Sequence, residues 1–410
     1  MSIGMSDELK SFDQRAVIKV CGVGGGGGNA VKRMIEQGME DVEFIAVNTD
    51  AQALKESPAA VRLQIGTDIT SGLGSGADPT IGHQAAQEDR ERLADVLGGA
   101  DMVFVTTGLG GGTGTGAAPI VAEVARSSGA LTVGIATLPF AFEGNERMDN
   151  AMTGLAEMEA HVDTLVVIPN ERVARICQEN ISFLEAFKHA DEVLHNGVRA
   201  ISELITIPGL INLDFADVRT IMKARGRALM GIGVATGENR AVRAAEEAIV
   251  CPLLEQSNIH GAKGVVANIK GGCDIGMREV QEAVATVKDA AHPDANIIFG
   301  AVVDDEERPD LQVTVIAAGF ETGVSDSFLN EENIVQLKPI EVNSPQSESK
   351  GVPNTDAAAS ADPEQVATAA REEAEYLFPQ EEAASGASEP QEPEEDISVP
   401  AFMRKKRRIQ

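Results

Sequence analysis

Large aromatic side chains are scarce in this sequence. It contains no Trp and one Tyr among 410 residues, although 43% of its residues are apolar. Val, Ile, Leu and Ala must therefore supply most of the buried surface. A chain of this length can form two or three domains.

Cysteine is equally sparse, and neither cysteine nor histidine shows the spacing of a metal site. No Cys-x-x-Cys pair occurs, and the six histidines follow no ligand pattern. We therefore expect reduced, mostly buried thiols and no metal site built by the protein alone. The four cysteines are Cys21, Cys177, Cys251 and Cys273.

Positive charge and long apolar runs are also lacking. The formal net charge of −30 argues against nucleic acid as a partner. No apolar run approaches the roughly 20 residues that span a bilayer, so direct membrane insertion is not expected. The segment from Met1 to Lys10 lacks the basic and apolar regions of a signal peptide, which favours a cytoplasmic protein.

The first half of the chain alternates between strand and helix patterns. Short, continuous apolar runs are typical of strands that are buried on both faces of a parallel sheet. The alternation predicts a doubly wound α/β domain. The expected strands are Val17–Val20, Phe44–Val47, Met102–Val105, Thr132–Ala136 and Leu165–Ile168, and the expected helices are Ala30–Gln37, Arg90–Leu97, Ala117–Arg126 and Met148–His161.

A long helical pattern follows, from Phe183 to Leu204, and it stops at the breaker pair Pro208-Gly209. Beyond it the alternation resumes and predicts a second, smaller α/β domain with a mixed sheet. Its expected helices are Ala216–Leu229, Arg240–Val250 and Arg278–Ala290, and its expected strands are Gly231–Ala235, Gly264–Ile269, Ile297–Val303 and Leu311–Ala317.

The composition changes after about residue 325. Residues 326–395 hold 17 acidic and 3 basic residues, and such a segment cannot bury enough apolar surface to fold, so we expect disorder. The chain then ends in an apolar stretch from Ile397 to Met403, followed by the basic run Arg404–Arg408. This end is typical of a docking peptide on an acidic tether. The alternative is a solvated tail without a role.

Two glycine-rich segments follow expected strands, at residues 22–28 and 108–116. Backbone turns of this kind bind phosphate through their N–H groups. Taken by itself, the first segment fits the dinucleotide fingerprint through Gly22, Gly24 and Gly27. Asp50 lies about where the ribose-binding acid of that fingerprint would be. No Lys-Ser or Lys-Thr pair follows either segment, which excludes a Walker-type loop. Because both segments end strands of one parallel sheet, they can surround one polyphosphate.

The second segment carries a specific resemblance. Residues 110–116 (GGGTGTG) match the signature of the tubulin/FtsZ family, and residues 48–54 (NTDAQAL) and 212–219 (NLDFADVR) resemble its bacterial cell-division branch. The resemblance extends over about residues 16–320. It implies a GTPase that binds GTP or GDP, polymerises head to tail into filaments and forms the division ring at the future septum, at midcell. A monomeric NAD-binding oxidoreductase and a tubulin-like plasmid or phage filament protein are the alternatives.

The resemblance also implies a set of nucleotide contacts. The phosphates are expected on the signature loop, and residues 72–78 resemble a mobile loop near the terminal phosphate. Glu143 and Arg147 match ribose and base-side contacts; the alternative is a surface ion pair. The backbone contacts implied by the two glycine loops are Gly25, Gly26, Gly27, Gly28, Asn29, Gly112, Thr113 and Gly114.

Phe187 and Asp191 are expected to select the base. They are four residues apart on the long helix and therefore share a face. Phe187 can stack on a purine, while the Asp191 carboxylate accepts both donors of the guanine edge. Adenine would turn an acceptor toward the same carboxylate, so GTP is favoured. The alternative is a core phenylalanine beside a solvated acid.

Asp214 and Asp217 have the positions of an N-cap and a first-turn acid. The resemblance implies that their loop enters the nucleotide site of the next subunit, where Asn212, Asp214 and Asp217 orient the attacking water. Mg²⁺ is implied by this phosphoryl chemistry, without a visible protein cage.

The expected organisation has six parts. The last of them is the terminal peptide, to which the resemblance assigns two kinds of partner: membrane-anchored division proteins and assembly regulators. Ser398-Val399 interrupts the family's usual pattern in this peptide. The parts are a flexible arm (1–15), a GTP-binding domain (16–180), a central helix (181–207), a domain that activates hydrolysis (208–325), a disordered acidic linker (326–395) and the partner-binding peptide (396–410).

Overall fold

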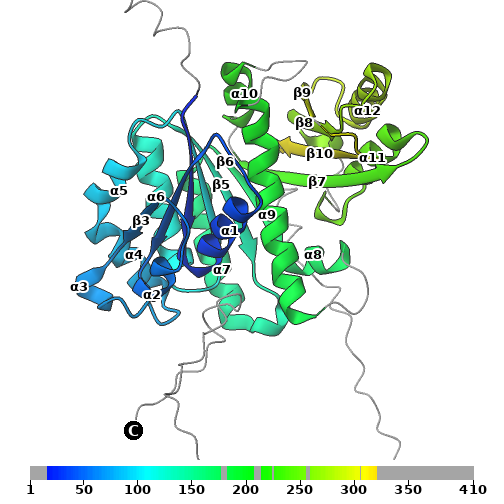
Figure 1. Cartoon of the computed structure of the whole chain (residues 1–410). Helices are drawn as coiled ribbons and strands as arrows, with labels where there is room; N and C mark the ends of the chain where they lie inside the picture. Colours follow the sequence, from blue (N-terminus) through cyan, green and yellow to red (C-terminus); the bar gives the residue numbers. More distant parts are fainter. Residues whose placement is uncertain are drawn as a thin grey trace, which may run out of the picture. The chain divides into compact units, whose positions relative to one another are not determined.

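A β-sheet of ten strands organises the described part of the chain (Figure 1). The computed structural model describes residues 16–176, 182–206, 214–223, 226–254, 259–304 and 306–320. The acidic linker and the terminal peptide lie outside these residues. In order across the sheet, the strands are β3 (Val61–Gln64), β2 (Glu43–Asn48), β1 (Ile18–Val23), β4 (Met102–Gly108), β5 (Leu131–Leu138), β6 (Thr164–Pro169), β7 (Gly226–Thr236), β10 (Asp310–Ala318), β8 (Gly264–Gly271) and β9 (Asn296–Val303).

The first six strands are parallel, and their order reverses between β1 and β4. Every residue of β1 and β5 is buried, as expected for strands with helices on both faces. The predicted doubly wound α/β architecture is confirmed. In such sheets a ligand binds at the point where the order reverses, beyond the carboxyl ends of the strands.

The second half forms the predicted mixed sheet. Strand β10 is antiparallel to β7 and β8, and β9 is parallel to β8. The two halves join through β6 and β7, whose pairing extends only from Thr164↔Gly226 to Val166↔Ala228. The sequence did not predict this short junction.

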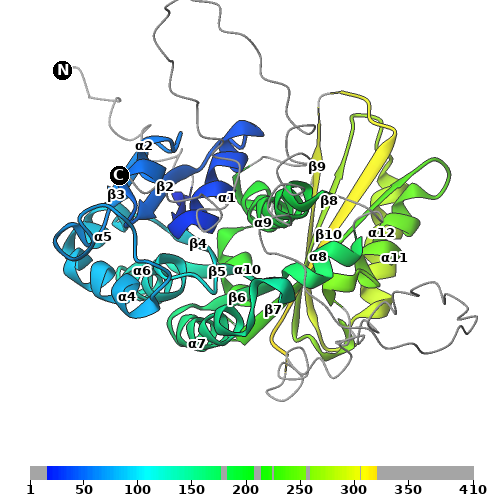
Figure 2. The same cartoon turned by 90° about the horizontal axis from the view of Figure 1, so that it is seen from below.

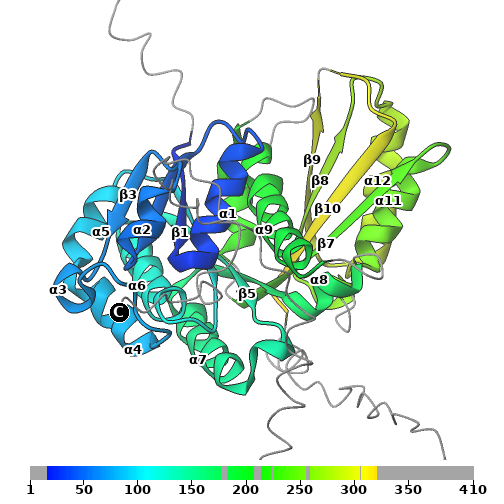
Figure 3. The ribbon, with the colours of Figure 1, turned by 60° about the horizontal axis from the view of Figure 1, so that its bottom comes forward.

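Helices cover both faces of the sheet (Figures 2 and 3). Buried side chains of α1, α9 and α10 share one apolar cluster with the strands, α4 to α7 cover the opposite face, and α11 and α12 cover the second half. None of the helices in the described ranges has the length and apolarity needed to cross a bilayer. The helices are α1 (Gly24–Glu36), α2 (Ala51–Lys55), α3 (Thr67–Thr70), α4 (Pro79–Glu88), α5 (Arg90–Leu97), α6 (Thr113–Ser127), α7 (Asn145–His161), α8 (Asn170–Ile176), α9 (Phe183–Thr206), α10 (Phe215–Met222), α11 (Arg240–Ile249) and α12 (Met277–Ala290).

Several element boundaries differ from the sequence prediction. Helix α1 begins at Gly24, inside the glycine run, because its packing against the sheet outweighs the low helix propensity of glycine. The helix expected over Ala216–Leu229 ends at Met222, and Gly226–Leu229 belongs to β7. Of the cysteines expected to be mostly buried, Cys21 and Cys251 are buried free thiols, whereas Cys273 is exposed. Cys177 lies outside the described residues.

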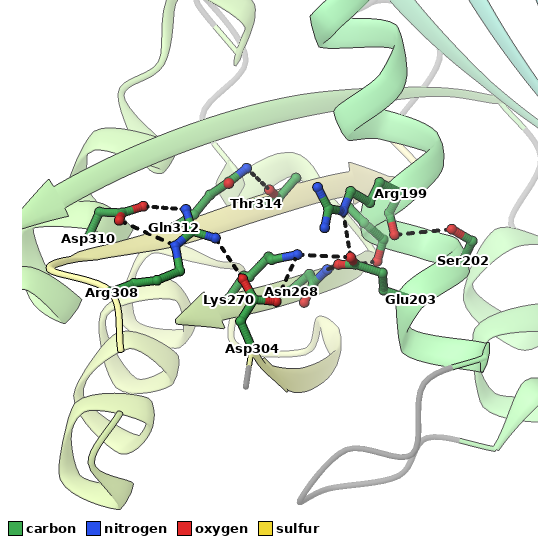
Figure 4. A network of polar contacts seen from close by, with 11 residues as sticks. Arg199, Ser202, Glu203, Asn268, Lys270, Asp304, Arg308, Asp310, Gln312 and Thr314 are labelled. Atoms are coloured by element: carbon green, nitrogen blue, oxygen red, sulfur yellow. Dashed lines mark hydrogen bonds and ion pairs between the residues drawn. The ribbon is translucent and has the colours of Figure 1, made fainter. Parts of the chain in front are cut away.

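A network of charges fastens the long helix α9 to the second half of the sheet (Figure 4). Glu203 of α9 accepts from Arg199 one turn earlier and from Lys270 of β8, whose Nζ lies 3.1 Å away. Lys270 also lies 3.3 Å from Asp304, which pairs with Arg308 at 2.7 Å. Glu203 and Lys270 are both buried, and each keeps a second partner, Arg199 and Asp304 respectively, so every buried charge of the network is compensated.

Glycine allows α1 to approach the sheet closely. A Cβ on Gly27 would lie 2.3 Å from the Thr106 carbonyl oxygen of β4, and a Cβ on Gly22 would lie 2.3 Å from the Gly27 carbonyl oxygen. The neighbouring Gly28 faces open space, with nothing within 4 Å of a Cβ. Within one glycine run, some positions are therefore required by packing and others are not.

We expect Gly27→Ala to destabilise the protein by about 2 kcal/mol or more, because β4 and α1 must separate to admit the methyl group. The matched substitution Gly28→Ala should leave the fold intact and stabilise α1 by up to about 1 kcal/mol. Urea unfolding of the two variants measures the difference. Equal unfolding midpoints would contradict the packing role of Gly27.

Candidate functional site

A cavity of about 760 Å³ opens at the carboxyl ends of the parallel strands. Its walls come from segments that follow β1, β2, β4, β5 and β6, from the loop between α3 and α4, and from α9. This is the edge at which the strand order reverses between β1 and β4. Residues lining it include Gly25, Gly26, Asn29, Arg33, Asp50, Ser75, Gly112, Thr113, Gly114, Glu143, Arg147, Asn170, Phe187 and Asp191.

The two glycine-rich segments form one site. Strands β1 and β4 are hydrogen-bonded neighbours, and helices α1 and α6 begin immediately beyond them. A Cβ on Gly24 would lie 2.7 Å from the backbone nitrogen of Gly114, so the two turns touch each other. Two helix N-termini with free N–H groups therefore meet at the cavity, an arrangement that favours a polyanion.

Hydroxyl groups surround the start of α6. The Thr113 hydroxyl lies 2.7 Å from that of Thr49 and 3.0 Å from that of Ser75. Inside the same turn, the Gly110 N–H donates to the Thr115 hydroxyl at 2.8 Å. All four hydroxyl-bearing residues are buried, so these bonds give the glycine loop a defined shape.

Glu143 and Arg147 form the ion pair that the sequence suggested as an alternative, with 2.8 Å between Oε2 and Nη1. The pair lines the cavity, and the Glu143 side chain is only 4% exposed. Its other oxygen accepts from the Phe140 backbone N–H at 2.9 Å. Glu143 is therefore held in a fixed position at the cavity wall and does not form an ordinary surface pair.

Phe187 and Asp191 lie on the same face of α9 and both line the cavity. Phe187 meets Phe140 edge to face, with 5.2 Å between the ring centres. Burial raises the pKa of Asp191 from its ordinary value of 3.8 to about 7, because desolvation outweighs the opposing attraction of the Arg33 guanidinium. A carboxylate held this way gains from any ligand that brings hydrogen-bond donors.

Asn170 was not singled out from the sequence. It begins α8 directly after β6, is 5% exposed and lines the cavity. Its buried Oδ1 has no hydrogen-bond partner in the described part of the chain. The signal that could have found it is its position at a strand's carboxyl end, which is where the other site residues lie. Arg33 was also missed, although it lies one turn beyond Asn29 on the cavity side of α1.

Gly27 and Gly28 do not line this cavity. Gly27 packs against β4, and Gly28 borders a separate small cavity of about 40 Å³ behind α1. The remaining predicted contacts on the two glycine loops, on α9 and at residues 143 and 147 are brought together.

Asp214 and Asp217 lie away from the cavity. As expected, Asp214 caps α10 by accepting from the Ala216 N–H at 3.2 Å, and Asp217 is in the first turn. On the same helix, Arg219 donates to the Gly129 carbonyl at 3.2 Å, just before β5 begins, whereas Thr137 at the far end of β5 lines the cavity. A strand of this length spans about 20 Å.

In Figure 1, α7 and α8 lie near one end of α9, and α10 lies near its other end. Asp214 and Asp217 are both exposed, so they are open to another molecule but out of reach of their own cavity. Asn212 lies outside the described residues.

No cluster of three or more acidic, histidine or cysteine side chains within the described ranges could hold a metal ion. Among the carboxylates at the cavity, Asp50 caps α2 by accepting from the Gln52 N–H at 2.8 Å, and Glu143 is paired with Arg147. Oxygen ligands for a hard cation would therefore come mainly from a bound phosphate.

Family models match both halves of the chain. The GTPase domain of the tubulin/FtsZ family matches residues 17–178, and the C-terminal domain of the FtsZ family matches residues 226–321. The interpretation as an NAD-dependent oxidoreductase is therefore wrong, although the strand order is the dinucleotide-binding one.

Solved structures agree with the family models. An empty FtsZ dimer from M. jannaschii is 45% identical, with a TM-score of 0.72, and the match covers 76% of this chain and 92% of that one. CetZ2 from Haloferax volcanii, solved as a protofilament bound to GTPγS, is 23% identical with a TM-score of 0.64 over 76% and 96% of the two chains, which supports the fold. The chain belongs to the tubulin/FtsZ family and is a tubulin-like cytoskeletal GTPase that binds guanine nucleotide.

Proposed function

We propose that this GTPase assembles head to tail and that each subunit hydrolyses GTP with acids supplied by its neighbour. The observation that carries the proposal is the position of Asp214 and Asp217. Both are exposed on α10, at the opposite end of the sheet from the cavity of their own chain. Catalysis by these acids then requires a second molecule, which presents its α10 to the open cavity.

The cavity fits guanosine triphosphate as follows. The phosphates bind the backbone N–H groups of Gly25, Gly26 and Asn29 and of the loop from Gly112 to Gly114, at the two helix N-termini. Glu143 and Arg147 contact the ribose, and the base stacks on Phe187. Asp191 and Asn170 then face the base edge.

In the proposed mechanism, Asn212, Asp214 and Asp217 of one subunit orient a water molecule toward the terminal phosphate in the next. Orienting this nucleophile is the main task that phosphoryl transfer requires of a protein. Mg²⁺ would accompany the phosphates, with Asp50 as a carboxylate that lines the same cavity, and when bound it would neutralise phosphate charge.

Self-association has support from the relatives. One was solved as a dimer and another as a protofilament. A contact that joins α10 of one subunit to the cavity of the next is heterologous, so it repeats in one direction and gives an open filament.

We further propose the domain organisation and cellular role expected from the sequence. The GTP-binding part (16–180), the central helix (181–207) and the activating part (208–325) make the filament. The acidic linker (326–395) tethers the terminal peptide (396–410), which recruits membrane-anchored division proteins to a ring at midcell. The support for this role is the membership of the family together with the charge pattern of the tail.

We expect Asp191→Asn to lower the preference for GTP over ATP by about 100-fold or more. An amide offers one donor and one acceptor, which suits the adenine edge, whereas guanine needs two acceptors. Competition binding measures the preference. Glu192→Gln, at an exposed neighbour on α9, is the matched control, and an unchanged preference in Asp191→Asn would refute the assignment.

The same variant should stabilise the nucleotide-free protein in a pH-dependent way. Folded Asp191 keeps its proton up to about pH 7, while the unfolded chain releases it near 3.8. Ionisation therefore favours the unfolded state progressively above pH 3.8, and fully above pH 7. The gain from Asn should be small near about pH 4 and reach roughly 2–4 kcal/mol above about pH 7, as read from thermal unfolding.

We expect Asp217→Asn and Asp214→Asn to lower GTP turnover by about 100-fold or more while leaving GTP binding and stability close to wild type, because asparagine caps a helix as well as aspartate. Glu91→Gln, an exposed first-turn acid on α5, is the control. Turnover per wild-type subunit should rise with concentration, and added mutant should lower it beyond dilution. Concentration-independent turnover that added mutant does not change would refute the shared site.

Deletion of residues 397–410 should leave GTP hydrolysis intact and abolish recruitment of membrane-anchored partners. Hydrolysis in solution and localisation of the tagged protein measure the two effects, with an equally long deletion inside the linker, residues 370–383, as the control. Failure of the truncated protein to hydrolyse GTP would contradict the modular organisation.

A further inference from the structure

The loop between α3 and α4 is held in an unfavourable backbone conformation. Gly72, Gly74 and Gly76 have φ values of 78°, 84° and 63°, and Ala77 has a φ of 68°. The left-handed region is open to glycine, but it is strained for alanine. Residues 73–77 nevertheless line the nucleotide cavity, so contacts with the rest of the protein must hold the loop there.

The start of the loop is attached through the backbone, because the Ala51 N–H donates to the Gly72 carbonyl at 3.0 Å and Leu73 bridges to Asp50. Ser75 attaches the middle of the loop. Its hydroxyl lies 3.0 Å from the Thr113 hydroxyl at the start of α6, and the residue is only 6% exposed. Among residues 73–77, all of which the structure describes, this is the only side-chain hydrogen bond to another element. The contact is also close in space, because a Cβ on Gly112 would lie 2.2 Å from the Ser75 hydroxyl oxygen.

Thr113 belongs to a chain of three hydroxyls. Thr49, fully buried after β2, lies 2.7 Å from Thr113 on the other side. The three hydroxyls carry three protons. The two hydrogen bonds between them use two of these protons, so one proton is left to donate to a ligand. When Thr113 donates its proton to a phosphate oxygen, both Thr49 and Ser75 must donate to Thr113.

A bound phosphate would therefore fix which hydroxyl donates to which. It would also strengthen the hydrogen bond from Ser75 to Thr113, because linked hydrogen bonds polarise one another. We propose that Ser75 is a positioning residue that fastens the loop of residues 72–78 to Thr113 and thereby slows nucleotide release. The inference rests on the proposed binding of phosphate by Thr113. One neutral hydrogen bond corresponds to about a 3- to 10-fold change in rate.

The test is the release of a fluorescent GDP analogue from the full-length protein, chased with excess GDP in a stopped-flow instrument. Ser75→Ala should release the analogue about 3- to 10-fold faster than wild type. Ser71→Ala, an exposed serine in the same loop, should release it at the wild-type rate. Ser75→Cys keeps the size with a weaker donor and should also release faster.

A double-mutant cycle separates this role from simple loop packing. If Ser75 acts through Thr113, Ser75→Ala should have no further effect in a Thr113→Val background. Additive effects, or wild-type release by Ser75→Ala, would overturn the inference. Equilibrium binding of the analogue to wild type is measured first, because absence of binding there would refute the nucleotide site itself, whereas binding with unchanged release refutes only the role of Ser75.

Discussion

The pairing of β1 with β4 is the constraint on which the site depends. These strands run side by side from Ile18↔Met102 to Val23↔Thr107, at the point where the strand order reverses. Their glycine turns leave the sheet together, and α1 and α6 begin at the same edge. Because every neighbouring strand is parallel, the segments after β2, β5 and β6 reach this edge too. The cavity is a consequence of the strand order. Because the glycine turns carry no side chains, a phosphate can approach their backbone.

Helix α9 has a different electrostatic character at its two ends. Near its start, Asp191 faces the cavity and holds its proton to about pH 7, so its charge is costly until donors arrive. Near its other end, Glu203 is buried but is satisfied by Arg199 and Lys270. Glu203 therefore has a structural role, whereas Asp191 lies where a ligand would bind. One helix thus combines a fixed anchor to the second half of the sheet with the group that we propose recognises the base.

Local pattern was sufficient for much of this fold. Apolar runs located nine of the ten strands, and the spacing of Phe187 and Asp191 placed both on one face of a helix. The cap at Asp214 also followed from local chemistry. The start of α1 did not, because its glycines have low helix propensity and become helical only through contact with β4. The three-residue junction of β6 with β7 has no local signature either. Asn170 was missed although it lies just beyond a predicted strand, because its side chain belongs to no glycine loop and to no recognised motif.

The distance between α10 and the cavity has a consequence for the arithmetic of an assembly. If each complete site needs the cavity of one subunit and the acids of another, a linear filament holds one fewer complete site than it has subunits. A pair would run at half of the turnover per subunit of a long filament. One end would carry a nucleotide that nothing hydrolyses, and the other would present acids with nothing to act on. The two ends of such a filament would differ chemically from the moment it formed.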